Sequence, residues 1–306
     1  MTATPESFAG RGRGTGTQAI SRAFAVLNVF RDEGTELGVV QLAERLGLTL
    51  STAHRIARAL VAEGYLAQEQ GHERYHLGTQ SLLLGQAAQR AMGMDVARPV
   101  LERLAVQTAE SVNLGLLDGH HAWVIQRIES PQPLRFSVEV GTQIELYATS
   151  MGKSLLAFND ELRGYVNSLG DDLVQFTHKT LASRKSLRQD LIQIRQRGWS
   201  VDDEESMLGV RCVAAPILDP TGQARGAVAV QAPAVRMPEP RFGELGPAVR
   251  RAADELALLL PISRLDRTPS GYPAPSRHGG PAAWPTAHAA GHRSGTGVTE
   301  PTGIQT

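Results

Sequence analysis

The chain of 306 residues contains one cysteine, Cys212, which excludes an internal disulfide framework and a zinc site built from several cysteines. Long apolar runs are also absent. The longest, such as residues 256–260, fall far short of the roughly 20 residues that a membrane-spanning helix needs. Residues 1–10 lack the apolar segment that a secretion signal contains. From these absences we expect a cytoplasmic protein that does not enter a membrane.

An excess of either charge is lacking as well, because 31 Lys and Arg balance 31 Asp and Glu. At first sight this balance argues against a nucleic-acid binder, which usually carries a basic patch. The average conceals the spacing, however. Four arginines and no acid stand between Ser7 and Arg31, and three arginines and no acid stand between Arg45 and Ala62. The composition therefore excludes only a DNA binder that relies on bulk charge.

The two ends differ in composition from the rest of the chain. Residues 10–16 read Gly-Arg-Gly-Arg-Gly-Thr-Gly, which predicts a flexible basic arm, either a solvated tail or a segment that reaches DNA. Residues 265–306 contain 13 Gly and Pro in 42 positions and five large apolar side chains. We expect this tail to be disordered, since it cannot bury enough surface to offset its conformational entropy.

Apolar spacing predicts three helices and a hairpin in the first 80 residues. The first helix has apolar residues at i, i+3, i+4, i+7 and i+10, and the second, over 39–46, ends at Gly47. Thr49 or Ser51 can cap the third, and Gly64 ends it. Strands are expected at 65–69 and 73–77. The apolar positions of the first and third helices are Ile20, Ala23, Phe24, Leu27, Phe30, Ala53, Ile56, Ala57 and Leu60.

This order of elements is that of a winged helix-turn-helix, in which the last of the three helices enters the DNA major groove. Its outward face combines short hydroxyls near the helix start with long cationic side chains, which suit phosphates and guanine edges. An ordinary solvated helix could look the same, but the hairpin that follows favours DNA binding. The candidate DNA-binding residues are Arg22, Ser51, Thr52, His54, Arg55, Arg58 and Arg74.

The rest of the ordered chain reads as mixed α and β. Helices are expected at 80–92, 96–109, 151–158, 183–197 and 241–260, and strand pairs at 111–117 with 122–128 and at 212–218 with 224–230. Antiparallel hairpins with helices suggest an α+β sensor-type domain. The helix at 80–92 is more apolar than a linker needs. We expect a dimer seam through Leu82, Leu83, Leu84 and Ala88, with packing inside its own chain as the alternative.

About 240 residues resemble the IclR-type bacterial transcriptional regulators in order and spacing. In the first part the resemblance rests on Ile20-Ser21-Arg22-Ala23, residues 42–48, Ser51-Thr52-Ala53-His54-Arg55, Glu63-Gly64-Tyr65-Leu66 and Tyr75-His76-Leu77-Gly78. In the second part it rests on residues 101–105, 110–114, 140–141, 148–157, 195–199, 202–205 and 209–216. The resemblance implies a dimeric regulator, often assembled as a tetramer and more commonly a repressor, that binds a pseudo-palindromic double-stranded DNA operator.

The resemblance also implies a GAF-like C-terminal domain that binds a small organic effector, frequently a carboxylic acid. The predicted architecture is therefore α+β. Its parts are a flexible basic arm (1–17), a winged helix-turn-helix (18–78), a linker and dimerisation helix (79–94), an effector-binding domain (95–264) and a disordered tail (265–306). Neither a cofactor nor a metal is expected.

Carried onto this chain, the family's effector pocket would use a loop at a helix start, an acidic segment and two strands. The residues are Thr149, Ser150, Met151, Gly152, Asp202, Glu204, Cys212, Ala229 and Gln231. Backbone N–H groups at the start of a helix suit a carboxylate. Two serines expected on the last strand are replaced by Ala229 and Gln231. The effector is therefore different from the family's usual ones, or the loop N–H groups carry its recognition alone.

Other interpretations stay open at this point. The acidic run 202–205 could be a solvated turn, and Cys212 could be a small buried core residue. Gly152-Lys153-Ser154 lacks the upstream glycine of a phosphate-binding loop, because position 147 is Tyr, so Lys153 would brace the loop or face solvent. The alternative function is a small-molecule enzyme on the C-terminal domain, with the N-terminal domain as an interaction module. We identify no catalytic residue for it.

Overall fold

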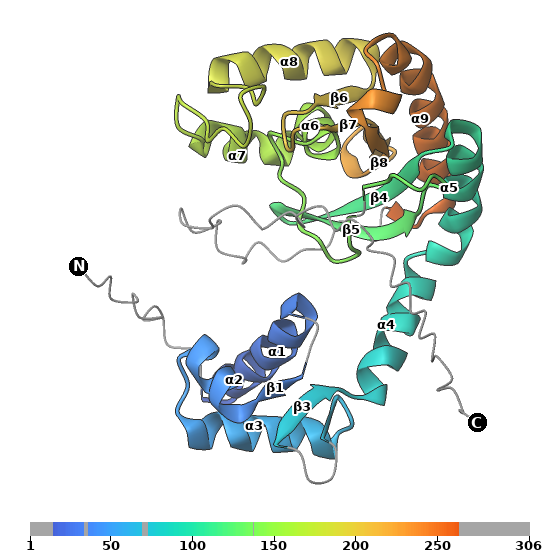
Figure 1. The fold of residues 1–306 in the computed structure, drawn as a ribbon. Coiled ribbons are helices and arrows are strands. Elements are labelled where there is room, and N and C mark those ends of the chain that lie inside the picture. Colours follow the sequence, from blue (N-terminus) through green and yellow to red (C-terminus); the bar gives the residue numbers. More distant parts are fainter. Residues whose placement is uncertain (1–14, 34–35, 69–72, 137, 263–306) are drawn as a thin grey trace, which may run out of the picture.

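The computed structural model describes residues 15–33, 36–68, 73–136 and 138–262. It shows an N-terminal head and a larger C-terminal domain joined by one helix, α4 (Figure 1). The predicted tail 265–306 lies outside the described residues. The same holds for the predicted arm, except for its last three residues, which begin the first helix. Within the described part, no helix is both long and apolar enough to cross a membrane.

The head is the predicted set of three helices followed by a small antiparallel sheet of order β1-β3-β2. Gly47 has a positive φ of 59° and ends α2, as the sequence predicts. The buried core draws on each helix and on the sheet, and includes Val26, Phe30, Leu42, Ala57 and Leu66. The elements are α1 (Thr15–Glu33), β1 (Leu37–Gly38), α2 (Val39–Leu46), α3 (Leu50–Ala62), β2 (Leu66–Gln68) and β3 (Arg74–Leu77).

One apolar face of α1 does not enter this core. Val26 and Phe30 are buried, whereas Ile20 and Phe24 are each 60% exposed. The periodicity correctly predicts an amphipathic helix, but Phe24 and Val26 are two residues apart and so lie on different faces of it. Ile20 and Phe24 therefore form a separate apolar face that is open to a partner.

The connecting helix α4 (Thr79–Ala91) has no buried residue. Leu82, Leu83 and Leu84 are each about half exposed or more, and Ala88 is exposed too. The predicted alternative, in which these residues pack inside their own chain, is therefore wrong for the three leucines. Their use as a dimer seam stays a prediction.

The C-terminal domain is a five-stranded antiparallel sheet of order β5-β4-β8-β7-β6 with helices on both faces (Figure 1). The core on one face involves α5 and α9, and the core on the other involves α6 with parts of α7 and α8. The strands are β4 (Ser111–Asp118), β5 (His121–Ile128), β6 (Ser200–Asp203), β7 (Val210–Leu218) and β8 (Ala224–Pro233). The helices are α5 (Met94–Thr108), α6 (Ser150–Phe158), α7 (Arg163–Ser168), α8 (Arg184–Arg197) and α9 (Pro240–Leu259).

The sequence misses two of these elements. The edge strand β6 reads Ser-Val-Asp-Asp, and its single apolar residue gives no alternating pattern that would predict a strand. It forms because Asp202 and its neighbours pair with β7. Helix α7 has only six residues, too few for a periodic signal.

Small residues on β7 and β8 bring α6 close to the sheet. Ala214, Ala227 and Ala229 belong to the core on the α6 side. At Gly152 a Cβ atom would lie 2.4 Å from the carbonyl oxygen of Glu145, so no larger residue fits there. The start of α6 is therefore packed tightly against residues 145 and 146, while the helix lies over β7 and β8.

Two glycines of α9 provide a matched test of the packing on this sheet. A Cβ at Gly246 would lie 2.3–2.6 Å from atoms of the Trp199 indole, while a Cβ at Gly243 meets nothing within 4 Å. We expect Gly246→Ala to destabilise the fold by about 1–3 kcal/mol through overpacking, and also because it precedes Pro247. Gly243→Ala should stabilise it by about 0.4–1 kcal/mol.

Denaturant unfolding of the two variants and the parent checks this prediction. If Gly246→Ala were as stable as Gly243→Ala, the packing of Trp199 against α9 would be contradicted.

Candidate functional site

Helix α3 is oriented in the head by its cap and by an apolar inner face. The Thr49 hydroxyl accepts a hydrogen bond from the backbone N–H of Thr52 (3.3 Å), which satisfies one of the unpaired N–H groups at the helix start. Ala53, Ala57 and Leu60 are buried on the inner face. The opposite face is consequently fixed toward solvent.

The predicted DNA-binding residues gather on that outer face. Ser51, His54, Arg55 and Arg58 are exposed on α3. This helix lies on the side of the head away from the C-terminal domain (Figure 1). Thr52 is half-buried, and its hydroxyl bonds to that of Thr49 (2.8 Å). Arg74 is exposed on the wing strand β3, and Arg22 is half-buried on α1. Hydroxyls and two arginines on one helix face can contact phosphates and base edges.

The second candidate site lies at the start of α6. The Thr149 hydroxyl accepts from the N–H of Gly152 (3.0 Å) and donates to the carbonyl of Glu145 (2.6 Å), which caps the helix. Ser150, Met151 and Gly152 are buried in its first turn. A helix start of this kind favours an anion through its N–H groups and its dipole.

Three of the other predicted effector residues form one row across the sheet. Asp202 on β6 pairs with Cys212 on β7, which pairs with Gln231 on β8. The side chains of Ser150 and Gln231 lie next to the Cys212 thiol, so the row meets the start of α6. Burial raises the pKa of Cys212 well above its ordinary value, which keeps the thiol neutral. Ala229 is also buried and paired with Ala214.

Asp202 is buried and ordered, so the interpretation of this segment as a solvated acidic turn is wrong for that residue. Its carboxylate accepts from the N–H groups of Glu205 (2.7 Å) and Ser206 (3.2 Å) and from the Ser206 hydroxyl (2.5 Å). Burial raises the pKa of Asp202 to about 6, and these hydrogen bonds limit the rise. Asp202 therefore holds the turn that follows β6.

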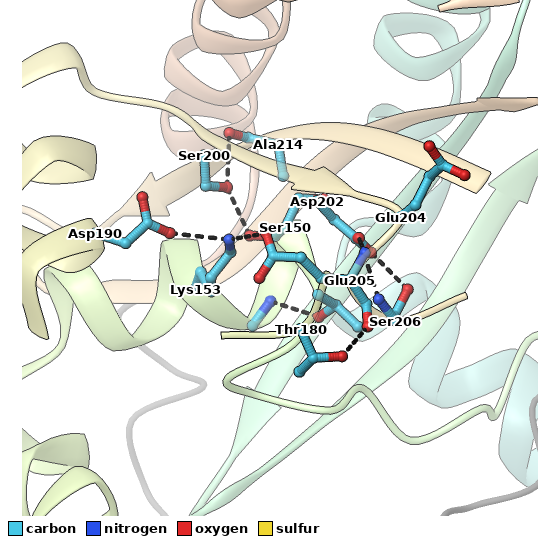
Figure 2. A network of polar contacts seen from close by, with 12 residues as sticks. Ser150, Lys153, Thr180, Asp190, Ser200, Asp202, Glu204, Glu205, Ser206 and Ala214 are labelled. Atoms are coloured by element: carbon cyan, nitrogen blue, oxygen red, sulfur yellow. Dashed lines mark hydrogen bonds and ion pairs between the residues drawn. The ribbon is translucent and has the colours of Figure 1, made fainter. Parts of the chain in front are cut away.

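Lys153 stands at the centre of a buried charge cluster. Its side chain is 2% exposed, and its ammonium lies 2.5 Å from a Glu205 carboxylate oxygen and 2.9 Å from one of Asp190 (Figure 2). Burial alone would lower the pKa of Lys153, but the two carboxylates raise it above its ordinary value. Burial raises the pKa of Glu205 to about 7 against the opposite effect of Lys153. Of the two predicted roles for Lys153, bracing is correct and exposure to solvent is wrong.

Glu204 points away from this cluster (Figure 2). Its carboxylate accepts from the Lys179 ammonium (2.7 Å) and from the N–H of Gly209 (2.8 Å). The hydrogen bond from Lys179 lowers the pKa of Glu204 first of all. Glu204 is therefore separated from the row that contains Asp202, and its predicted part in effector binding rests on the resemblance alone.

Three residues that the sequence does not single out as site residues are brought to this site by the fold. Glu205 and Asp190 complete the Lys153 cluster from the loop after β6 and from α8, and Asn113 of β4 donates to Gln231 (3.3 Å). Their separation along the chain leaves no local signal for any of them. Among the described residues, no group of three or more His, Cys, Asp or Glu is placed to hold a metal.

Comparison with known proteins identifies the family. The model of the IclR helix-turn-helix domain matches residues 19–70, and that of the bacterial transcriptional regulator IclR C-terminal domain matches residues 86–258. The chain belongs to the IclR family. The predicted family and fold class are thereby confirmed, and the protein is a DNA-binding transcriptional regulator.

Curated relatives cover most of the chain. The regulator BhcR of Paracoccus denitrificans is 34% identical over 243 residues, which are 79% of this chain and 87% of that protein. The transcriptional repressor IclR of Escherichia coli is 30% identical over 246 residues, 79% of this chain and 89% of that protein. The solved IclR of Thermotoga maritima is 28% identical with a TM-score of 0.63, covering 79% of this chain and 98% of the other.

The Lys153 cluster predicts a strong and specific effect of substitution. Lys153→Met leaves two carboxylates without their buried cation, and we expect a loss of about 3–5 kcal/mol in the free energy of unfolding. Lys179→Met is the control, because Lys179 is 32% exposed and surface pairs contribute about 0–1 kcal/mol. Chemical denaturation at neutral pH measures both. Equal losses would contradict the buried role of Lys153.

Glu205 also predicts a pH dependence. Its pKa is raised in the folded state to about 7 from 4.5, so the folded protein holds a proton that the unfolded chain has released. The ionisation of Glu205 therefore makes the protein less stable as pH rises from about 4.5 to 7. Glu205→Gln should make stability fall less steeply over that window, and the ionisation of Asp202 accounts for the fall that remains. Unfolding curves at several pH values test it, and an unchanged slope would disprove the assignment.

Proposed function

We propose that this protein is a ligand-responsive transcriptional repressor, acting in the cytoplasm, that binds an operator as a homodimer. The observation that carries the proposal is the outer face of α3. There His54, Arg55 and Arg58 are exposed together on the helix that a helix-turn-helix domain presents to DNA. Curated relatives that cover most of the chain include repressors, which supports negative regulation.

The dimer is supported by the exposed apolar surface of α4 and α1. Three consecutive leucines on α4 and two apolar residues on α1 remain open in one chain. Burying such surface is favourable by roughly 25 cal/mol per Å². We propose that a second copy of the chain covers this apolar surface. A dimer presents two heads to DNA and so doubles the modest basic surface of one head. A tetramer would be a pair of such dimers.

Two heads related by a dyad need a pseudo-palindromic operator. Adjacent major grooves on one side of the duplex are roughly 34–36 Å apart, so the two α3 helices would have to stand at that separation.

The effector site is supported by the start of α6 and the row Asp202, Cys212 and Gln231. The N–H groups of the first turn of α6 suit a carboxylate, and the neutral thiol and amide beside them suit other polar groups of a small organic acid. A regulator of the same fold from Microbacterium hydrocarbonoxydans, 22% identical with a TM-score of 0.68, was solved with 4-hydroxybenzoate.

A contact between the two parts offers a route for coupling. The guanidinium of Arg31 on α1 lies 5.1 Å from the centre of the Trp123 ring on β5, within range of a cation–π interaction. An effector that shifts β5 or its neighbours would change this contact and so bias the placement of the head.

The alternative of an enzyme receives less support. The carboxylates near α6 are engaged in the Lys153 cluster and in the turn after β6, and the relatives are regulators. We propose that the chain carries no catalytic activity.

Replacing Arg55 tests the proposed function. Arg55→Ala should weaken binding to the intergenic DNA upstream of its own gene by at least tenfold, since a bidentate guanine contact contributes about 1–3 kcal/mol per half-site. Arg251→Ala is the control, because it removes one exposed charge from the C-terminal domain. Fluorescence anisotropy at fixed salt measures both, with sedimentation to verify the assembly. Parental affinity in Arg55→Ala would disprove the role of α3.

A further inference from the structure

Asn113 is a buried polar residue that no part of the proposed function yet uses. It lies on β4, between the edge strand β5 and β8, and its side chain is buried, with the residue 2% exposed. Its strand neighbours Val112 and Leu114 face the α5 and α9 side, so Asn113 faces the α6 side. There it pairs with Ala229 on β8.

A chain of contacts orients the Asn113 amide. Ser150 and Gln231 lie next to the Cys212 thiol, and the side-chain carbonyl oxygen of Gln231 accepts a hydrogen bond from the Asn113 amide nitrogen (3.3 Å). The amide oxygen of Asn113 is thereby turned away from Gln231. That oxygen is buried and has no hydrogen-bond partner.

An unpartnered buried acceptor is costly, and it usually marks a place where a water or a ligand donates. Two other such atoms occur in the described part of the chain. Glu205 Oε2 belongs to a carboxylate that is already paired with Lys153, and Gln126 Oε1 lies on β5 opposite Leu114, on the other side of the sheet. Asn113 Oδ1 is therefore the one of these three atoms that is a neutral acceptor on the α6 face of the sheet, where the effector site is proposed.

We propose that Asn113 determines effector specificity by accepting a hydrogen bond from a hydroxyl group of the effector, with Gln231 as its positioning residue. The proposal rests on the proposed effector site and narrows its ligand to a hydroxylated small organic acid. Gln231 fixes the direction of the Asn113 oxygen, and its strand neighbour Ala229 has no side-chain donor for that oxygen. A serine at 229 could instead have satisfied Asn113 from within the protein.

Matched pairs of acids that differ by one hydroxyl test the proposal. The probes are glycolate and acetate, 3-hydroxybutyrate and butyrate, and 4-hydroxybenzoate and benzoate, titrated into the full chain by calorimetry without DNA. In at least one pair the hydroxy acid should bind about tenfold tighter, as expected for one buried hydrogen bond whose loss leaves its acceptor unpaired. Asn113→Leu, of similar volume, should abolish that preference.

Two further variants separate the acceptor from general damage to the sheet. Asn113→Ala also removes the acceptor and should abolish the preference. Gln126→Leu removes the unpartnered amide on the opposite face and should keep the preference. Parental melting temperatures verify folding, and should Asn113→Leu fail to fold, Asn113→Ala takes its place.

Several results would overturn the proposal. These are equal affinity within every pair, no binding of any of the six acids, survival of the preference in folded Asn113→Leu or Asn113→Ala, or its loss in Gln126→Leu. Binding without preference would leave the proposed effector site intact. The operator assay with Arg55→Ala contains no acid, so it tests the regulatory function independently.

Discussion

The ion pairs of the buried Lys153 ammonium constrain the whole effector side of the molecule. An ammonium withdrawn from water is tolerated only with close counter-charges, and here they come from α8 and from the loop after β6. By joining these segments to α6, the cluster fixes the helix start against the sheet. The small side chains on β7 and β8 then allow α6 to approach closely enough for Ser150 to reach Cys212.

The same constraint shapes what the site can bind. Because Lys153 already neutralises carboxylates of the protein, it is not available as the cation for an acidic ligand. Negative charge on a ligand must instead meet the backbone N–H groups of α6, and its other polar groups meet the neutral side chains of Cys212, Gln231 and Asn113. In the head, too, a chain of zero net charge exposes Arg55 and Arg58 together on one face of α3.

Local signals made the head predictable from the sequence. The Thr49 cap, the turn at Gly47 and the periodicity of α3 depend on neighbours within a few residues, and the structure confirms all three. The Lys153 cluster and the Asn113–Gln231 pair could not be predicted, because their members meet only when the sheet forms. The exposure of Phe24 could not be predicted either, because periodicity indicates an apolar face but does not show what covers that face.

The central claim is that effector and operator binding are coupled, and reciprocity tests it most directly. Operator affinity should be measured with and without a saturating hydroxy acid that binds in calorimetry, and the affinity for that acid with and without saturating operator. The account predicts that both affinities change by the same factor, clearly different from one. Operator affinity that is unchanged at saturating acid would contradict it.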